Sequence, residues 1–340
     1  MRQSAAAALA LTVLLFGGAY LAAGKHPAQE TEPDGGAVRE QSAQGQKDGG
    51  VQLAVKNGDA VEIMALDAYL QGVVRGEMPA SFELEALKAQ AAAERTYIYY
   101  QLAAGRKEVH PNADVCTDPS CCNAWLSEEA AREKWGGDFD GWESRIEEAV
   151  AATDGQVALY DGQPILAVFH SSSAGKTAGA GDVWSGDMPY LRSVDSPEGE
   201  ETVPNYYSAA EFTAAEAKAL LAQAHPELTF SGGPDKWFGA VEKDESGRVG
   251  TVEVCGAPLR GVEVRRIFSL RSACFTIDAA ADRVTFRVTG YGHGVGMSQY
   301  GANELARQGR TWQEILLWYY ADIAIGPAPE TVQTAENVIN

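Results

Sequence analysis

Short apolar runs separated by tight turns predict three β-hairpins. In each, apolar and polar residues alternate or an apolar run stands between turn-forming residues such as Asn57-Gly58 and Asp161-Gly162. The paired runs are 51–55 with 61–64, 157–160 with 165–169, and the two segments on either side of 244–247.

Apolar residues at helical spacing predict helices between and after these hairpins. The expected ranges are 66–74, 82–104, a helix from Asp140 to Gly155, and one from Thr311 to about Tyr320. Ser81 is the expected N-cap of the second helix and Gly105 its end. The last two begin with the spacing of a capping box. Helices and hairpins alternate without a βαβ repeat, so we predict an α+β fold.

The N-terminal region differs from the rest of the chain. An uncharged apolar run from Ala5 to Ala23 follows Arg2 and is about as long as a bilayer-spanning helix. We expect a single-pass membrane anchor, with a cleaved signal peptide as the alternative. The charge before the run places the rest of the chain outside the cytoplasm. The predicted segments are the anchor 1–23, a flexible linker 24–50, one large extracytoplasmic domain 51–325 with room for two lobes, and a tail 326–340.

The composition excludes some partners. The chain has 340 residues, of which 45% are hydrophobic and 22% charged, as in an ordinary folded protein, but its net charge is −20. Nucleic acids and anionic lipid surfaces bind basic faces, so we expect neither as a partner.

The segment Gly76-Glu77-Met78-Pro79 places a carboxyl group where a helix must stop. Pro79 cannot continue a helix, so Glu77 is expected at a helix end or in a loop. Beside an apolar pocket such a carboxyl has a raised pKa and can act as a general acid. In open solvent it would be an ordinary surface charge.

Arg95 lies on the apolar face of the second predicted helix, four residues after Ala91. A buried arginine needs an acidic partner. Two roles stay open for it, a structural ion pair or a contact beside Glu77.

A cluster of cysteines with a nearby histidine offers ligands for a tetrahedral metal ion. The candidate ligands are His110, Cys116, Cys121 and Cys122. A disulfide from this cluster to Cys255 or Cys274 is the alternative. Because the cysteine count is odd, metal ligands and a Cys255–Cys274 pair can also coexist.

Two loop segments are candidates for ligand contact. His170 and Ser171 follow a predicted strand and begin a run of small polar residues. A histidine beside serines suggests nucleophilic hydrolysis, but the Gly-x-Ser-x-Gly elbow is missing, and hydroxyls presented to a sugar fit as well. The glycines of segment 290–302, which carries His293 and Gln299, allow close approach of the backbone. Their spacing matches neither a phosphate loop nor a dinucleotide fingerprint, so no organic cofactor is expected.

Five separated stretches, taken in order, resemble the SpoIID family, the stage II sporulation protein D of endospore-forming bacteria. They cover most of residues 51–325. They are YLQGVVRGEMPASFELEALKAQAAAERTYIYY, VCTDPSCCNAW, FHSSSAGKT with DVWSGDMPYLRSVDSP, LRSACFTI, and GYGHGVGMSQYGANELARQGRTWQEILLWYY.

This resemblance implies a peptidoglycan lytic transglycosylase. Such an enzyme cleaves the bond between N-acetylmuramic acid and N-acetylglucosamine and leaves 1,6-anhydromuramyl ends. It implies denuded glycan strands as substrate, and a partner amidase and a membrane scaffold of the engulfment machinery. It also implies a place at the cell membrane, facing the space between mother cell and forespore. The family's catalytic glutamate matches Glu77, and further family positions match Arg95, Tyr190 and Arg192, the last usually a lysine.

The resemblance extends to some clostridial relatives, which bind zinc through a Cys-x4-His-Cys pattern. Cys116 and Cys122 match that pattern, whereas Cys121 stands in place of the histidine. The resemblance therefore implies a structural Zn²⁺ and leaves open whether Cys121 or His110 completes its ligands.

A lytic transglycosylase needs only one carboxyl group, because the substrate supplies its own nucleophile. Glu77 would protonate the leaving oxygen and then accept the proton of the muramyl C6 hydroxyl as that hydroxyl attacks C1. The expected sugar contacts are His170, Ser171, Tyr190, His293 and Gln299. The expected basic cluster that offsets the charge of −20 is Arg95, Lys176 and Arg192.

Two other functions stay open. The chain could be a glycan-binding activator of a cell-wall amidase without catalytic activity of its own. It could also be a zinc hydrolase of peptide or amide bonds, if the metal kept three protein ligands and a water.

Overall fold

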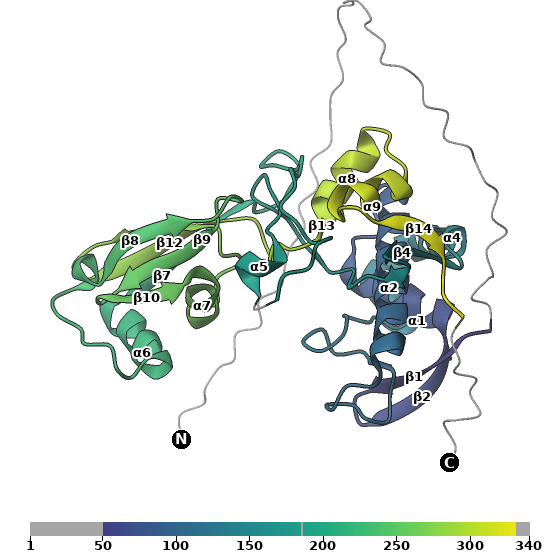
Figure 1. Ribbon diagram of the computed structural model, residues 1–340, viewed down its shortest axis with the longest axis horizontal. Coiled ribbons are helices and arrows are strands. Elements are labelled where there is room, and N and C mark those ends of the chain that lie inside the picture. Colours follow the sequence, from purple (N-terminus) through teal and green to yellow (C-terminus); the bar gives the residue numbers. More distant parts are fainter. Residues whose placement is uncertain (1–49, 185, 331–340) are drawn as a thin grey trace, which may run out of the picture. The chain divides into compact units, whose positions relative to one another are not determined.

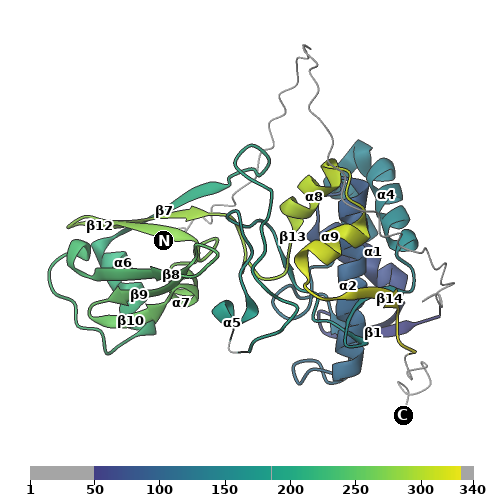
Figure 2. The ribbon, with the colours of Figure 1, turned by 45° about the horizontal axis from the view of Figure 1, so that its top comes forward.

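The computed structural model describes residues 50–184 and 186–330. The predicted anchor and all but the last residue of the predicted linker lie outside the described residues, as do residues 331–340 of the predicted tail. The described part is an α+β fold, as predicted, with two hydrophobic cores (Figure 1, Figure 2). Within it, no helix is long and apolar enough to cross a bilayer.

The first core lies in what we name the helical lobe, residues 50–206 and 290–330. Its helices are α1 (Leu66–Glu77), α2 (Leu84–Ala104), α3 (Glu128–Trp135), α4 (Phe139–Ala152), α5 (Ala180–Val183), α8 (Gln299–Arg307) and α9 (Trp312–Tyr319). Its strands are β1 (Gln52–Asn57), β2 (Ala60–Ala65), β3 (Val115–Cys116), β4 (Gln156–Tyr160), β5 (Gln163–Pro164), β6 (Phe169–His170), β13 (Met297–Ser298) and β14 (Ala324–Pro327).

Helix α2 is the centre of the helical lobe. It packs against α1, α4, α8, α9 and β4, which surround it in Figure 1. Its run Ala91–Ala93 is fully buried, and Leu87 and Ile98 are fully buried as well. Small apolar residues on all sides let neighbouring helices approach from several directions, which is the pattern of a fully buried helix.

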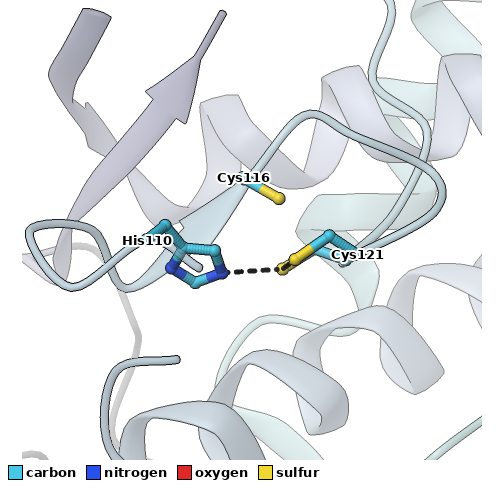
Figure 3. A group of neighbouring side chains, drawn as sticks. His110, Cys116 and Cys121 are labelled. Carbon is cyan, nitrogen blue, oxygen red and sulfur yellow. Dashed lines mark hydrogen bonds between the residues drawn. The ribbon is translucent and has the colours of Figure 1, made fainter. Parts of the chain in front are cut away.

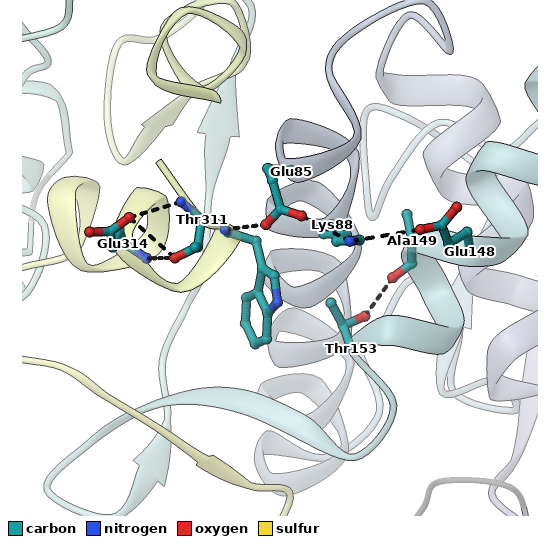
Figure 4. A network of polar contacts seen from close by, with 8 residues as sticks. Glu85, Lys88, Glu148, Ala149, Thr153, Thr311 and Glu314 are labelled. Atoms are coloured by element: carbon teal, nitrogen blue, oxygen red, sulfur yellow. Dashed lines mark hydrogen bonds and ion pairs between the residues drawn. The ribbon is translucent and has the colours of Figure 1, made fainter. Parts of the chain in front are cut away.

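A chain of polar contacts fastens α9 and α4 to α2 (Figure 4). The carboxylate of Glu85 accepts a hydrogen bond from the backbone N–H of Trp312 at 2.8 Å and pairs with Lys88 at 2.8 Å. Lys88 lies 3.9 Å from Glu148 on α4. The first turn of α2 thus serves as a common anchor for helices that are distant in sequence.

The second core lies in the β lobe, residues 207–289. Its elements are β7 (Tyr207–Thr213), α6 (Ala214–Ala224), β8 (Phe238–Lys243), β9 (Val249–Val254), β10 (Ala257–Arg260), α7 (Gly261–Ile267), β11 (Phe275–Ala279) and β12 (Arg283–Thr289). They form two antiparallel sheets with strand orders β10-β9-β8 and β11-β12-β7. Rings of this core gather around Phe286, with Phe268 at 4.6 Å between centroids. The lobe begins and ends at one point, where the N–H of Gly290 donates to the carbonyl of Tyr206 at 2.9 Å.

The predicted hairpins are confirmed in two of three cases. β1 pairs with β2, and β8 with β9, in antiparallel register. The middle one is wrong in its second strand, because the strand that follows β4, β5, has only two residues, 163 and 164. The chain then continues to β6, which pairs in parallel with the distant β13. The predicted boundary at residue 325 falls inside β14, which pairs with β4 as far as Pro327.

Two of the predicted helix starts need correction. The N-cap of α2 is Glu83, because Ser81 belongs to the turn that follows Pro79. Asp140 does not open a helix, since α3 and a short 3₁₀ turn lead into α4 with helical backbone at Asp138 and leave no extended residue to act as a cap. The capping box at Thr311 is confirmed.

Candidate functional site

Glu77 is the last residue of α1, as the proline two residues later predicts. Met78 leaves the helix with extended backbone. The Oε1 of Glu77 accepts a hydrogen bond from the backbone N–H of Ala124 at 2.6 Å. Burial raises the pKa of Glu77, and the hydrogen bond from Ala124 offsets this only in part. Glu77 is half-buried and so remains open on one side.

Two glycines on α1 allow the segment that carries this N–H to lie against the helix. A Cβ on Gly76 would lie 2.7 Å from the carbonyl oxygen of Ala124, and one on Gly72 would lie 1.9 Å from the Trp125 ring. Residues four apart share one face of a helix. The N–H of Leu126 donates to the carbonyl of Gly72 at 2.9 Å, which extends the contact by one more residue.

A second carboxyl group, Glu94 on α2, lies beside Glu77 and was not predicted. Its side chain is fully buried, and it accepts hydrogen bonds from Gln90 Nε2 at 2.9 Å and Asn123 Nδ2 at 2.6 Å. Burial, and next the negative charge of Glu77, raise the pKa of Glu94 well above its usual range. Since Glu94 is enclosed, it cannot touch a polysaccharide in this conformation.

Gln299, a predicted site residue on α8, contacts the backbone of Glu77 and the side chain of Gln90, which itself binds Glu94. Its Nε2 donates to the backbone carbonyl of Glu77 at 3.0 Å and lies 3.5 Å from Oε1 of Gln90. The hydrogen-bonded set, which we name the Glu77 group, is Glu77, Gln90, Glu94, Asn123, Ala124 and Gln299.

The four predicted metal ligands lie close together in space, and Figure 3 shows His110, Cys116 and Cys121. Their ligand atoms all lie within 4.8 Å of one another. The last of the four, Cys122, directly precedes Asn123 in the chain. Cys122 Sγ lies 3.5 Å from His110 Nε2 and 4.0 Å from Cys121 Sγ. Tetrahedral zinc with bonds of about 2.0–2.3 Å places its ligands roughly 3.5–3.8 Å apart, so the spacing is suitable.

The surroundings of this cluster also fit a metal ion. His110 Nδ1 lies 2.9 Å from the carbonyl of Ala113, so Nδ1 carries the hydrogen and Nε2 presents its lone pair to the cysteines. Lys107 donates to the carbonyl of Cys121 and lies 3.4 Å from Cys122 Sγ, where its charge offsets that of thiolates. The cluster can therefore hold a metal ion with His110 and Cys121 both among the ligands.

The alternative disulfides are not formed. All five cysteines are free thiols. Cys255 lies in the turn between β9 and β10, whereas the thiol of Cys274 points to the carbonyl of Gly247 at 3.6 Å. The Cys255–Cys274 pair that the odd count allowed is therefore absent, and neither residue is bonded to the metal cluster.

Arg95 is fully buried, as its place on the apolar face predicted. Its Nη2 lies 3.2 Å from Asp67 and donates to the carbonyl of Val150 at 2.9 Å. Of the two roles left open by the sequence, this geometry favours the structural ion pair.

The two predicted histidines lie close together, with ring centroids 5.7 Å apart, and His170 is buried whereas His293 is half-buried. His170 is 4% exposed, with Nδ1 at 3.2 Å from the carbonyl of Val295 and Nε2 at 2.7 Å from the hydroxyl of Ser173. Burial lowers the pKa of His170 well below its usual range and that of His293 to about 4. Because a backbone carbonyl rather than a carboxylate orients His170, the serine-hydrolase arrangement is not built here.

Each residue of the predicted basic cluster is paired with an aspartate. Lys176 pairs with Asp195 at 3.3 Å, and Arg192 pairs with Asp322 at 3.0 Å. The buried Arg95 pairs with the half-exposed Asp67 at 3.2 Å. Each positive charge is thus compensated locally, and the three cannot together offset the charge of the chain.

Tyr190 and Ser171 stay predictions as sugar contacts. The hydroxyl of Tyr190 accepts a hydrogen bond from the N–H of Leu166 at 3.1 Å, and its ring packs against Tyr160. The carbonyl of Ser171 accepts from the N–H of Tyr300 at 3.0 Å. Among the hydrogen bonds described above, Gln299 is the only predicted sugar contact that binds Glu77, and it does so through the backbone carbonyl of Glu77.

Comparison with known proteins shows that the chain is similar to a class of bacterial sporulation proteins. The family model described as "SpoIID: Stage II sporulation protein" matches residues 55–160. Stage II sporulation protein D of Bacillus subtilis (strain 168) is 36% identical over 269 residues, which cover 79% of this chain and 76% of that protein. The Bacillus amyloliquefaciens protein of the same name is 35% identical with the same coverage. The chain belongs to the SpoIID family.

A more distant relative is named for an effect on amidases. The amidase enhancer of Bacillus subtilis (strain 168) is 28% identical over 300 residues, covering 74% of this chain but only 39% of the enhancer.

The close contact at Gly76 is testable with a matched glycine. Gly141 lies in α4, and a Cβ added to it would meet open space, so Gly141→Ala is expected to stabilise the fold by about 0.5–1 kcal/mol through helix propensity. Gly76→Ala has the same propensity gain but pushes against the backbone of Ala124, and we expect net destabilisation and faster hydrogen exchange of the Ala124 amide. Urea denaturation and amide exchange measure both effects. Equal stabilisation by the two substitutions would contradict the tight contact.

Proposed function

We propose that this protein is a lytic transglycosylase that cleaves the bond between N-acetylmuramic acid and N-acetylglucosamine in peptidoglycan. The observation that best supports this proposal is that two neighbouring carboxyl groups differ in their exposure to solvent. Glu77 is open on one side and has a raised pKa, whereas Glu94 beside it is enclosed. Membership of the SpoIID family supports the substrate class.

The chemistry follows from the one accessible carboxyl group. A protonated Glu77 donates its proton to the leaving glycosidic oxygen. The resulting carboxylate accepts the proton of the muramyl C6 hydroxyl while that oxygen attacks C1, which closes the 1,6-anhydro ring. No water is consumed, and the proton count returns to its start. The N–H of Ala124 stabilises the carboxylate stage at 2.6 Å.

Hydrolysis through two carboxyl groups fits less well. Hydrolytic glycosidases place a second carboxylate on the sugar as nucleophile or as base for water. The charge of Glu77 raises the pKa of Glu94, which makes Glu94 the candidate for this second group. Glu94 is enclosed, however, and accepts hydrogen bonds from the side-chain amides of Gln90 and Asn123. An enclosed carboxyl can position its neighbours but cannot reach C1.

We also propose that the cysteine cluster holds a structural Zn²⁺. Four protein ligands close a tetrahedral site and leave no position for a reactive water, which disfavours the zinc hydrolase. Cys122 is followed directly by Asn123 and Ala124, which contact Glu94 and Glu77. When bound, the ion would supply rigidity to this loop.

The cellular setting is proposed on the same basis. The apolar run at residues 5–23 would anchor the chain in the membrane with the two lobes outside the cytoplasm. Denuded glycan strands, a partner amidase and the engulfment scaffold are the proposed partners. The relative named amidase enhancer favours a second candidate, a glycan-binding activator of a cell-wall amidase.

Product analysis separates these functions. The full chain is incubated with peptide-stripped glycan strands, with Glu77→Gln in parallel, and strand ends are identified by mass spectrometry. We expect anhydromuramyl ends from the native protein and a loss of at least about 100-fold with Glu77→Gln. Reducing ends would indicate water as nucleophile. Strands that bind without being cut would favour the amidase activator.

The pH dependence of strand cleavage follows from the pKa of Glu77. The acid form is the one that acts first, and burial raises the pKa, so the active form persists to higher pH than for a solvent-exposed glutamate. We expect kcat/KM to decline as pH rises through this raised pKa. His293, with a pKa of about 4, does not contribute a change near neutral pH. A kcat/KM that increases through this range would contradict Glu77 as general acid.

The zinc proposal predicts different outcomes for two cysteine variants. Elemental analysis should find about one zinc ion per chain in the native protein, and a chelator should lower the melting temperature by about 5 °C or more. Cys122→Ser is expected to lose the ion and this stabilisation, whereas Cys255→Ser, away from the cluster, keeps both. A chelator that releases no metal and leaves the melting temperature unchanged would refute the zinc site.

A further inference from the structure

A pocket formed by the α7 region of the β lobe and Tyr291 of the helical lobe is lined by three arginines and an aromatic ring. It has a volume of about 440 Å³ and lies where α7 ends. The lining residues are Val262, Arg265, Arg266, Ser269, Leu270, Arg271 and Tyr291. No carboxylate is among them, although the chain as a whole carries a charge of −20.

Two of these arginines differ from those described above. Arg192 faces a carboxylate at 3.0 Å, and Arg75 forms a buried pair with Glu143. Within residues 50–184 and 186–330, Arg265 and Arg271 have no carboxylate within 4.0 Å. The Nε of Arg265 donates to a backbone carbonyl at 3.2 Å, while the Nε of Arg271 is buried without a hydrogen-bond partner in this part of the chain.

The remaining members make the pocket suited to an anionic ligand that carries a ring. The guanidinium of Arg271 lies 4.3 Å from the ring centroid of Tyr291, which is 47% exposed. Glu263, which is not in the lining, lies 3.8 Å from the exposed Arg266 and also contacts His225 at 3.0 Å. A guanidinium fork binds a carboxylate through two hydrogen bonds, and an aromatic face stacks on a sugar ring.

Backbone contacts connect this pocket with the Glu77 group. Tyr291 pairs through both its N–H and its carbonyl with Ser172, and the adjoining Ser171 accepts from the N–H of Tyr300. The ring of Tyr300 packs edge-on against Phe82 at 4.9 Å, five residues after Glu77. Tyr300 directly follows Gln299, which holds the backbone of Glu77.

We propose that Arg265, Arg271 and Tyr291 bind a muramyl carboxylate and its sugar ring on the glycan strand that Glu77 cleaves. The inference rests on the proposed function and assigns a binding site for that substrate. The lactyl carboxylate of a muramyl residue is free only where no stem peptide is attached, because the peptide converts it to an uncharged amide. The pocket therefore selects strands from which peptides have been removed.

Binding to two kinds of strand tests this site. The full chain carries Glu77→Gln to prevent cleavage, and calorimetry compares peptide-free strands with the same strands after reduction of their carboxylates to alcohols. We expect the carboxylated strands to bind at least about 10-fold more tightly, and Arg271→Ala to abolish that difference. Arg283→Ala, an exposed arginine on β12 that pairs with Asp282, is the matched control and keeps it. Equal binding of both strands to the parent protein would overturn the proposal.

Arg271→Ala could reduce binding by unfolding the protein, because part of Arg271 is buried. A second variant therefore tests the site independently. Tyr291→Ala removes an exposed ring and is expected to weaken binding of both strands about 3- to 10-fold while melting at the parent temperature. No loss of affinity with Tyr291→Ala and with folded Arg271→Ala would also overturn the site.

Failure of the binding site and failure of the proposed function give different outcomes. Anhydromuramyl ends produced by the native protein, together with unchanged KM in Arg271→Ala, would refute the pocket and leave the transglycosylase intact. Carboxylate-dependent binding without any cleavage by the native protein would refute the transglycosylase and keep the pocket in a glycan-binding activator.

Discussion

The contact of segment 123–126 with the glycine face of α1 is the constraint on which the candidate site depends. Only glycine at positions 72 and 76 leaves room for this segment. Once it lies there, Asn123 contacts the buried Glu94 and Ala124 contacts the accessible Glu77. The cysteine cluster ends at Cys122, so the candidate metal ligands, the buried carboxyl and the accessible carboxyl are held by the consecutive residues 122, 123 and 124. A disturbance of one of these features is therefore transmitted to the others through the backbone.

Features with local causes could be predicted from the sequence, and features that depend on distant contacts could not. Pro79 fixed the end of α1, and the spacing of the cysteines indicated their cluster. Glu94 was missed, because a glutamate in a helix is usually on the surface and its partner Asn123 lies 29 residues away. Its signal was its position four residues after Gln90 in an alanine-rich helix. The capping box at Asp140 failed for a related reason, since a preceding helix that sequence spacing did not reveal already supplied the helical backbone.

The distribution of charge shows why counting charged residues was insufficient. The basic residues expected to attract the glycan each have an aspartate beside them. Arg265 in α7 and Arg271 in the segment after it have no carboxylate partner within the described residues, and no motif marks them. Their signal was density, because Arg265, Arg266 and Arg271 occur close together in an otherwise acidic chain. Compensation within the folded protein, rather than the sum of charges, determines where an anion can bind.

The hydrogen bond between Gly290 and Tyr206 has an evolutionary consequence. It brings both ends of the β lobe to one point, so residues 207–289 form an insertion that leaves the helical lobe continuous around it. Insertions with adjacent ends can change in length or content at little cost to the host fold. Glu77 and the cysteine cluster belong to the host, whereas Arg265 and Arg271 belong to the insertion. Under the function and the binding site proposed above, exchange of this one module can change substrate selectivity while Glu77 stays in place.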